Sequence, residues 1–266
     1  MLTAARALAL NVDSSPELPR VPSLRPLYDI GWKARFGDLI MVAGAPKSQK
    51  SAFAMFYVAQ MGLPTLYLAA DMTGFQASVR LACMILGRPT EQVEAMMHDP
   101  EGKAIVLAAL ESVNISFRFG SPITWRGVDA ELEAWVELHN EYPAVIVWDN
   151  IIDTEGCETN YESQSELMQD LAALKSDIGS TIFALHHCTD KPKDRTREVY
   201  LPPPRADIKN GLAEKPERVL TVATNSMDLR FRAAPVAQRD GVSDASGNTF
   251  AVLQSEPQLT RFSPAY

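Results

Sequence analysis

The sequence predicts an α/β protein in which a mostly parallel, twisted sheet is flanked by helices, and three observations support this. From Gly37 to His186, short apolar runs alternate with longer amphipathic segments. The short runs are continuously apolar, as is typical of strands that are buried on both faces. The run at residues 39–43 leads through a loop of small residues into a helix-like segment from Lys50. A strand, loop and helix in this order is typical of a phosphate-binding site.

Length and composition are those of an ordinary globular protein. The 266 residues, of which 46% are apolar, can bury a full core as one large domain. The net charge of -8 argues against a general attraction to polyanions, so any contact with nucleic acid must be local. Three widely spaced cysteines fit a reducing compartment. With no signal-like or membrane-spanning segment in the sequence, we expect a cytoplasmic protein without a membrane partner.

The N-terminal residues differ in composition from the rest. Residues 1–27 include prolines at positions 16, 19, 22 and 26, and proline is excluded from helix interiors and central strands. We therefore expect a Pro-rich arm at residues 1–27 and a single domain at residues 28–266. Two interpretations of the arm remain open: a disordered terminus, or a segment that docks on a neighbouring subunit.

The elements follow in order from residue 38. Predicted strands lie at residues 38–43, 65–70, 115–119, 144–148 and 181–186. Predicted helices lie at residues 50–61, 74–86, 100–113, 126–141 and 163–178. Residues 189–211 form a long polar loop, and loops of this length are usually functional or disordered. The short alternating segments 218–224, 227–235, 249–253 and 259–262 are expected to be final, partly antiparallel strands.

The loop Gly44–Ser51 carries the main candidate site. It matches G-x-x-x-x-G-K-S except that Gln49 stands in place of the last glycine. Backbone amides at the helix N-terminus would hold phosphate, Lys50 would neutralise phosphate oxygens, and Ser51 would ligate Mg²⁺. Glycine before the lysine lets the backbone approach phosphate, so Gln49 either imposes a different loop or weakens binding. The candidate residues for binding ATP are Gly44, Lys47, Ser48, Gln49, Lys50 and Ser51.

Two strands end in an acidic residue. Asp149 follows an apolar run, and in phosphate-loop enzymes such an aspartate supports the bound Mg²⁺. Asp71 follows another run, where a carboxylate orients or deprotonates an attacking water. Each has a plainer interpretation: Asp149 as a turn or cap residue, and Asp71 as the cap of the helix that starts near Gly74.

Several segments in this order carry a resemblance to a known family. They are residues 39–55, residues 66–80 with Asp-Met-Thr followed by Gln76 and Arg80, and residues 145–149, 183–187, 207–211, 237–241 and 260–262. Together they resemble the ATPase domain of DnaB-type replicative helicases, within the RecA-like superfamily. The resemblance covers nearly everything from Gly37 to Phe262. No counterpart of the family's N-terminal primase-binding domain is present, so we expect a minimal, phage-like form.

The resemblance implies a RecA-like fold, a ring that is commonly a hexamer, and ATP with Mg²⁺ at the subunit interfaces. It assigns the phosphate and Mg²⁺ roles to Lys50, Ser51 and Asp149. Asp71 stands where the family has its catalytic glutamate, which is one methylene longer. His187 stands where a glutamine senses the γ-phosphate, although by itself it is an exposed histidine at a strand end.

The resemblance also implies contacts between subunits and with DNA. Arg239 matches the arginine that enters the neighbouring subunit's site in trans, and Ala237 replaces the lysine that accompanies it. The loops at residues 151–163 and 189–211 correspond to loops that line the central channel. The candidate contacts to single-stranded DNA are Lys191, Lys193, Arg195, Arg197 and Lys209. The alternative is a solvated loop, because the basic residues of this segment only slightly outnumber the acidic ones.

Three functions follow from these expectations. The first is a ring-forming, ATP-dependent DNA translocase or helicase in replication or recombination, working with a loader or other replication proteins in the host cytoplasm if it is phage-encoded. The second is a nucleotide- or DNA-binding scaffold with weakened catalysis, because Gln49, Asp71 and Ala237 all depart from the family at the catalytic site. The third is a recombination protein that forms filaments, since head-to-tail interfaces that fail to close produce helices.

Overall fold

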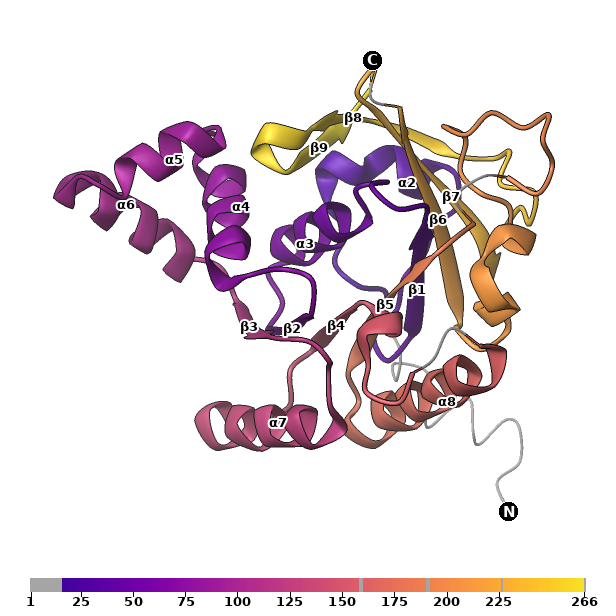
Figure 1. The fold of residues 1–266 in the computed structure, drawn as a ribbon, viewed down its shortest axis with the longest axis horizontal. Helices are drawn as coiled ribbons and strands as arrows, with labels where there is room; N and C mark the ends of the chain where they lie inside the picture. The colour runs from indigo at the N-terminus through magenta and orange to yellow at the C-terminus, as the bar shows by residue number, and fades with distance from the viewer. Residues whose placement is uncertain (1–15, 158–159, 190–191, 226, 266) are drawn as a thin grey trace.

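The computed structural model describes residues 16–157, 160–189, 192–225 and 227–265. In this part of the chain, one nine-stranded sheet has the order β3-β2-β4-β5-β1-β6-β7-β8-β9 (Figure 1). Strands β3 to β6 in that order are parallel, and β7, β8 and β9 continue antiparallel. The predicted sheet, mostly parallel with antiparallel strands at its C-terminal end, is confirmed. The strands are β1 (Leu39–Gly44), β2 (Thr65–Ala69), β3 (Ile115–Phe119), β4 (Val145–Asp149), β5 (Thr181–His187), β6 (Arg218–Asn225), β7 (Arg230–Gln238), β8 (Ala251–Glu256) and β9 (Arg261–Pro264).

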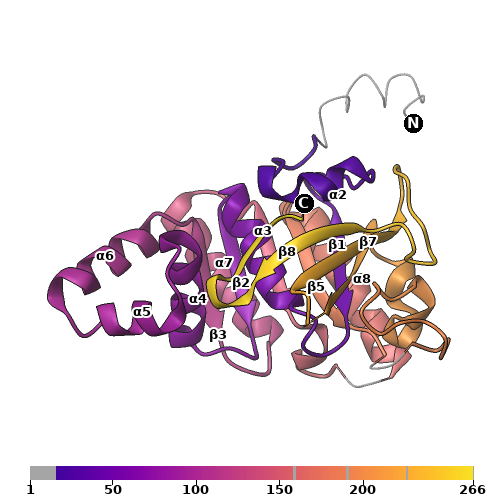
Figure 2. The same ribbon diagram turned by 90° about the horizontal axis from the view of Figure 1, so that it is seen from above.

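Helices cover both faces of the sheet (Figures 1 and 2). The α-helices are α2 (Arg25–Asp29), α3 (Lys50–Met61), α4 (Gly74–Leu86), α5 (Thr90–Met96), α6 (Pro100–Glu111), α7 (Trp125–His139) and α8 (Tyr161–Ile178). Short 3₁₀ turns are η1 (Pro22–Leu24), η2 (Ile151–Asp153), η3 (Arg205–Asp207), η4 (Lys209–Glu214) and η5 (Pro257–Leu259). Helices α2, α3 and α4 pack on one face, while α7, α8 and η4 pack on the other. None of the described helices is both long and apolar enough to cross a membrane.

Strand β1 shows how the continuous apolar runs are used. Ile40 and Val42 point into the core layer that contains α3, and Met41 and Ala43 point into the layer that contains α8. Successive side chains of a strand alternate between its faces, so a central strand that is covered on both sides must be apolar throughout. The loop that follows β1 is therefore fixed at the carboxyl end of the most buried part of the sheet.

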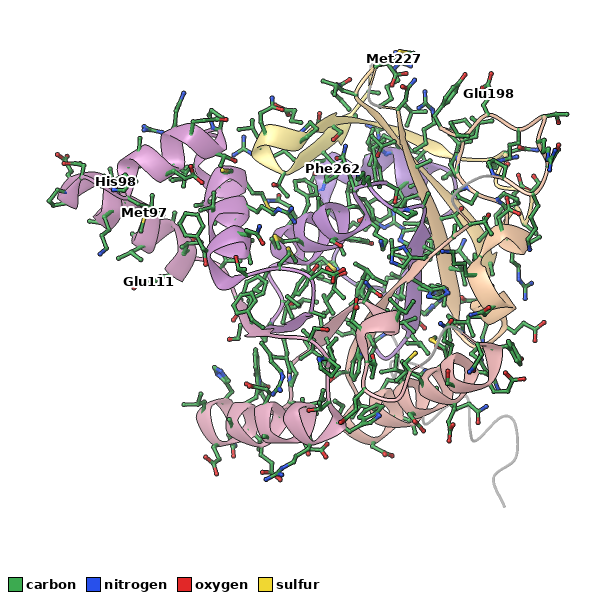
Figure 3. All side chains as sticks on the ribbon, viewed as in Figure 1. Met97, His98, Glu111, Glu198, Met227 and Phe262 are labelled. Atoms are coloured by element: carbon green, nitrogen blue, oxygen red, sulfur yellow. The ribbon has the colours of Figure 1, made fainter. Side chains whose placement is uncertain are left out.

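The C-terminal strands cover the helix that follows this loop. Phe262 of β9 lies against α3 (Figure 3), with ring centroids 5.6 Å from Phe53 and 5.4 Å from Phe56. Its ring also lies 4.8 Å from that of Phe231 in β7. Aromatic pairs at these separations add to the stabilisation from area burial. The antiparallel strands thus hold α3 in place as well as extending the sheet.

Strand β7 begins and ends about three residues later than the predicted segment 227–235. It includes Pro235, and the pairing with β6 shifts register between Val219 and Leu220. Proline lacks an amide donor and is tolerated inside a sheet at a bulge. The bulge lets the strand continue to Gln238, three residues beyond the end of the predicted segment at Pro235.

Two short segments depart from the sequence expectations. Helix α5 lies in a stretch for which we had predicted no element, and with α4 and α6 it encloses a small separate core. His98 and Glu111 lie in this outlying group, away from the sheet (Figure 3). The predicted arm is the second departure. The first 15 residues lie outside the described part, but from residue 16 onward the chain packs against the domain.

This N-terminal segment contributes to the core instead of extending from it. The Leu18 amide donates to the Ala34 carbonyl at 2.7 Å, and most apolar residues between them are almost fully buried. Pro22 and Pro26 stand in the first turns of η1 and α2, where a missing amide hydrogen costs nothing. The expectation of an extended arm was therefore wrong for residues 16–27, because it overlooked this helix-start position for proline.

Candidate nucleotide-binding site

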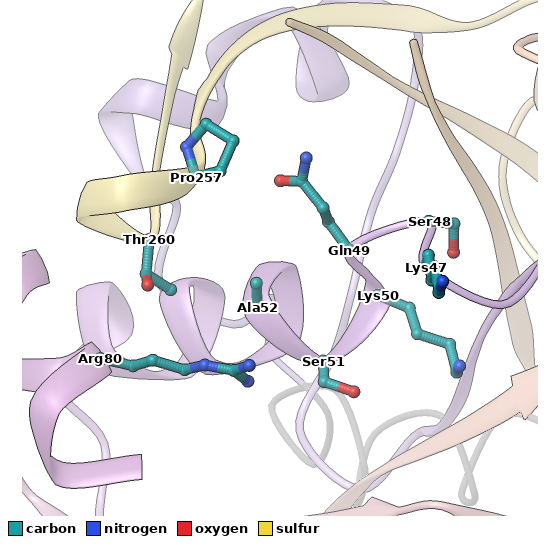
Figure 4. A pocket seen from close by; sticks show the side chains of 9 residues that line it. All are labelled: Lys47, Ser48, Gln49, Lys50, Ser51, Ala52, Arg80, Pro257 and Thr260. Atoms are coloured by element: carbon teal, nitrogen blue, oxygen red, sulfur yellow. The ribbon is translucent and has the colours of Figure 1, made fainter. Parts of the chain in front are cut away.

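The loop between β1 and α3 surrounds a cavity of about 340 Å³. Residues 47–52 line it, together with Arg80 from α4 and with Pro257 and Thr260 beside η5 (Figure 4). Helix α3 begins at Lys50, so the unpaired amides of its first turn face this loop. Free amides and the helix dipole favour an anion at such a position. The geometry thus fits the phosphate-binding loop expected at Gly44–Ser51.

Gly44 is required by close packing at the start of the loop. A Cβ at this position would lie 2.9 Å from both the Val222 side chain and the Val222 carbonyl oxygen, and it would collide with Ser48 Oγ. The loop also turns back on the sheet, where Thr224 Oγ1 donates to the Ser48 carbonyl at 3.0 Å. Ser48 Oγ is buried without a partner among the described residues. An orphaned hydroxyl here is consistent with a site that a ligand would complete.

Gln49 adopts the left-handed conformation that a glycine would normally take. Its φ is 65°, which costs a side-chain-bearing residue roughly 1–2 kcal/mol. Its side chain points away from Lys50 and Ser51 (Figure 4), and its Oε1 accepts a hydrogen bond of 2.7 Å from the Ser255 hydroxyl in β8. The glutamine therefore keeps the backbone geometry of the motif and links the loop to the antiparallel strands. Of the two outcomes left open by the sequence, a different loop backbone is not what the structure has, and the effect of Gln49 on binding stays a prediction.

Lys50 is a buried cation at the floor of the loop. Only 8% of the residue is exposed, and its Nζ lies 3.4 Å from His187 Nδ1 at the end of β5. Burial lowers the pKa of the ammonium, although the carboxylates of Asp149 and Asp71 oppose this. An incoming phosphate would supply the missing negative charge. The structure thus brings together Lys50 and His187, which the sequence analysis had placed in the same site.

Ser51 and Asp149 form the pair expected of a Mg²⁺ site. Ser51 Oγ donates to Asp149 Oδ1 at 3.0 Å, and the Tyr67 hydroxyl donates to Asp149 Oδ2 at 2.8 Å. Burial raises the pKa of Asp149, and these two hydrogen bonds oppose the shift. Mg²⁺ typically takes few protein ligands and keeps its waters and substrate phosphates. A hydroxyl and a carboxylate at the loop therefore fit that ion.

Asp71 does not cap the helix that follows it. Thr73 is the N-cap of α4, and its side chain and that of Gln76 form a reciprocal capping box. Asp71 instead accepts a hydrogen bond of 3.2 Å from the Asn150 side chain, next to Asp149. The capping interpretation is wrong, and the carboxylate is left at the carboxyl edge of the sheet beside the other candidate residues.

The opposite end of the strands carries Arg239. It directly follows β7, where Gln238 pairs with Arg218, whereas Gly44 at the loop pairs alongside Val222. The separation from Arg218 to Val222 is about 13 Å of strand, at roughly 3.3 Å per residue. Arg239 therefore stands at the far edge of the sheet from Lys50 in the same chain.

The basic residues of the loop after β5 are only partly available for a ligand. Arg197 donates to the Pro202 and Gly247 carbonyls and to Asn248 Oδ1, which fastens its guanidinium to the turn at residues 244–249. Lys193 Nζ donates to the Ala206 carbonyl, although Lys193, like Arg195 and Lys209, is exposed. Lys191 lies outside the described residues. Contact with DNA by these residues stays a prediction.

Three residues at the site were not singled out from the sequence, and a fourth, Arg80, was named only as part of the family resemblance, without a role. Tyr67 and Asn150 hold the two aspartates, Arg80 lines the cavity, and Ser255 holds Gln49. Only Asn150, adjacent to Asp149, had a local signal. The others come from elements that are distant in sequence, and only the folded sheet brings them together.

The strand order, with this loop between β1 and α3, defines a RecA-like fold. Among solved structures, an isolated ATPase domain aligns with a TM-score of 0.75 at 14% identity, covering 99% of this chain and 98% of that chain. A DnaB-like replicative helicase aligns with a TM-score of 0.72 at 13% identity over 86% of this chain. This chain spans 59% of the length of that helicase. The resemblance read from the sequence is thereby confirmed at the level of the fold.

Relatives by sequence come from bacteriophages. The chain is 28% identical over 261 residues to the Gene 65 protein of Mycobacterium phage L5, covering 96% of this chain and 95% of that protein. It is 27% identical over 223 residues to the Gene 65 protein of Mycobacterium phage D29, covering 81% and 94%. No family model matches the chain.

Proposed function

We propose that this protein is an ATP-dependent DNA translocase or helicase that works as a ring of identical subunits, in the manner of DnaB-type enzymes. The observation that carries the proposal is the separation of two sets of residues. Lys50, Ser51 and Asp149 gather at the carboxyl edge of the sheet, while Arg239 projects from the opposite edge. A site that needs both sets can be completed only by two subunits placed head to tail.

Each residue then has a defined task in hydrolysis. The loop amides and Lys50 would hold the phosphates of ATP, and Ser51 and Asp149 would hold Mg²⁺, which would supply charge neutralisation. Asp71, fixed by Asn150, orients or deprotonates the attacking water. His187, in contact with Lys50, detects the γ-phosphate. Arg239 of one subunit neutralises charge that develops in the site of the next.

Single-stranded DNA is the proposed polymer that such a ring moves along. The loops at residues 151–163 and 189–211 leave from the same edge of the sheet as the phosphate loop. Lys193, Arg195 and Lys209 are exposed on the second loop and would follow a phosphate backbone, and Lys191 belongs to the same loop in the sequence. Because its relatives by sequence are phage proteins, we place its proposed action in a host cytoplasm. A loader or other replication proteins are part of the same proposal.

One observation favours a second function, a scaffold that binds nucleotide or DNA with little hydrolysis. Gln49, Asp71 and Ala237 all depart from the helicase pattern in residues that serve the chemical step. A carboxylate one methylene short leaves the water poorly aligned, and misplacement by about 1 Å can cost roughly 100-fold in rate. This alternative predicts nucleotide binding without DNA-stimulated turnover.

The deciding experiment measures ATP hydrolysis with and without single-stranded DNA, beside a Lys50→Ala control. We expect the wild-type rate to rise with DNA and the Lys50→Ala rate to fall by about 100-fold or more, because phosphate charge loses its fixed partner. Equal rates for the two proteins would reject the motor and favour the scaffold. Images of the particle with ATP and DNA would separate a closed ring from a recombination-type filament.

A further inference from the structure

A fixed carboxylate stands at the edge of the sheet opposite the phosphate loop. Glu217, just before β6, accepts a hydrogen bond of 2.7 Å from the Leu39 amide at the start of β1. Its other oxygen lies 3.0 Å from Lys175 Nζ in α8, and both side chains are nearly buried at 14% and 13% exposed. Lys175 Nζ also donates to the Gly37 carbonyl at 2.9 Å. The carboxylate is thus held from two sides by buried parts of the domain.

Arg239 is attached to this carboxylate at two points. Its amide donates to the Glu217 carbonyl at 3.1 Å, and its Nη1 lies 3.3 Å from Glu217 Oε1. The arginine side chain is nevertheless 67% exposed. The backbone and the guanidinium end of Arg239 are therefore both held by Glu217, while much of the side chain remains exposed to solvent.

The next residue is anchored as firmly. Asp240 accepts a hydrogen bond of 2.6 Å from the buried Arg218 and lies 2.9 Å from Arg35. Arg218 is in turn paired with Asp38 at 2.5 Å. Arg239 thus lies between two residues that are held in place: Glu217, which pairs with it, and Asp240, which follows it in the sequence. These contacts limit the directions that its guanidinium can take.

We infer that Glu217 is a positioning residue that aims Arg239 at the nucleotide of the neighbouring subunit. This inference rests on the proposed function, because it assigns a task at the subunit interface. An ion pair with one partner this exposed contributes little to stability, so stability alone does not account for the contact. A rigid cation in the right direction has less conformational freedom to lose when the transition state forms. Glu217 itself touches neither substrate nor DNA.

The test replaces Glu217 by glutamine, which keeps the length and one acceptor oxygen but removes the charge. We expect kcat for ATP to fall about tenfold and KM to change less than about twofold, since the loss concerns the transition state. Glu131→Gln is the matched control, because Glu131 pairs with Arg118 at 3.5 Å on the surface, and it should leave kcat unchanged. A kcat for Glu217→Gln within twofold of wild type would overturn the inference. If Glu217→Gln does not fold, Glu217→Asp decides by the same criterion.

Mixed assemblies separate positioning from a general structural role. Subunits with Glu217→Gln retain an intact phosphate loop, and subunits with Lys50→Ala retain a well-aimed Arg239, so mixing them should restore activity at the shared interfaces. Absence of this rescue would place the effect of Glu217 within its own subunit and overturn the inference. In an Arg239→Ala background, Glu217→Gln should cause no further loss, whereas a second tenfold loss would count against positioning.

The proposed function can fail separately. If Arg239→Ala alone leaves kcat unchanged, the trans role of Arg239 is wrong and the task of Glu217 disappears with it. If Arg239→Ala abolishes turnover but Glu217→Gln does not reduce it, only the positioning inference is wrong.

Discussion

The two ends of the parallel strands bury charged groups to opposite effect. At the carboxyl end, burial lowers the pKa of Lys50 and raises the pKa of Asp149, and their neighbours do not fully offset this. At the amino end, burial also acts to lower the pKa of Arg218, but its pairs with Asp38 and Asp240 outweigh it and raise the pKa. At the carboxyl edge, the neighbouring groups do not fully stabilise the buried charges, as a ligand site requires. At the amino edge, ion pairs within the chain stabilise them.

The largest expected effect concerns Arg239, which extends from the amino edge of the sheet. Arg239→Ala should lower turnover by about 1,000-fold or more while nucleotide affinity stays nearly constant, because such an arginine acts on transition-state charge. Steady-state hydrolysis and equilibrium nucleotide binding measure the two quantities. Mixing with Lys50→Ala subunits should restore part of the activity. Without such rescue, Arg239 would be a structural arginine and the two edges would not cooperate across subunits.

The strength of the amino-end network can be tested through stability. Arg218→Ala should reduce the free energy of unfolding by about 3–5 kcal/mol, because it leaves the nearly buried Asp38 without its cation. Arg25→Ala is the matched control: Arg25 pairs with Asp29 at 3.4 Å with side chains 78% and 61% exposed, and its loss should cost about 1 kcal/mol or less. Denaturant unfolding gives both values. Similar losses for the two variants would refute the contrast between the edges.

At the carboxyl end of the strands, a buried histidine should make the free energy of unfolding depend on pH. Burial lowers the pKa of His186, at the end of β5, to about 4 from an unfolded value near 6.5, and its Nε2 donates to the Lys209 carbonyl at 3.1 Å. The unfolded chain binds a proton in this window and the folded chain does not, so stability falls as pH drops from about 6.5 to about 4. The loss amounts to about 3 kcal/mol.

His186→Gln removes this titration. The difference in unfolding free energy between pH 7 and pH 4 should therefore be smaller in the variant than in the wild type by that amount. The carboxylates titrate equally in both proteins, so their contributions to the pH dependence of the unfolding free energy cancel in the comparison. Identical pH dependences would mean that His186 is accessible to protons in the folded state.

The smallest expected effect concerns Gln49. Gln49→Gly relieves the left-handed backbone but leaves the Ser255 hydroxyl without its acceptor, and both contributions are about 1 kcal/mol. We therefore expect nucleotide affinity to stay within about threefold of wild type or to weaken. Ser255→Ala, which removes the same hydrogen bond without changing the backbone preference, should weaken binding slightly. Affinity raised tenfold by Gln49→Gly would show that the glutamine is only a cost.

Local patterns were sufficient for most of the fold. The predicted helices at residues 50–61 and 74–86 match α3 and α4 residue for residue, because a left-handed glycine directly follows the apolar period of each. The segment at residues 16–27 was misjudged, because Pro22 and Pro26 occupy helix starts while the leucines of the segment reach the core. A pattern rule about proline carries no information on what the neighbouring side chains will contact.

Residues of the candidate site could be predicted where the residue type and its position in a motif indicate a role. Lys50, Ser51 and Asp149 follow from the motif and the strand end, and the structure brings them together. The residues that hold other side chains in place could not be predicted. Tyr67 looks like any aromatic residue of a strand. Glu217 and Arg218 look like solvated charges near the start of a strand. Their partners lie in distant elements, so only the register of the sheet reveals the pairing.

Lys50, which follows β1, and Arg239, which follows β7, lie at opposite edges of the sheet, and this placement has a consequence for activity in solution. Under the proposed function, one chain would carry halves of two different sites, and the catalytic unit would be the contact between chains. By mass action, activity per chain would then decline on dilution and recover as the protein is concentrated. A dilution series of the wild type thus measures assembly through its hydrolysis rate. Inert Lys50→Ala chains added to dilute wild-type protein would raise that rate, because each would supply its Arg239 to a wild-type site.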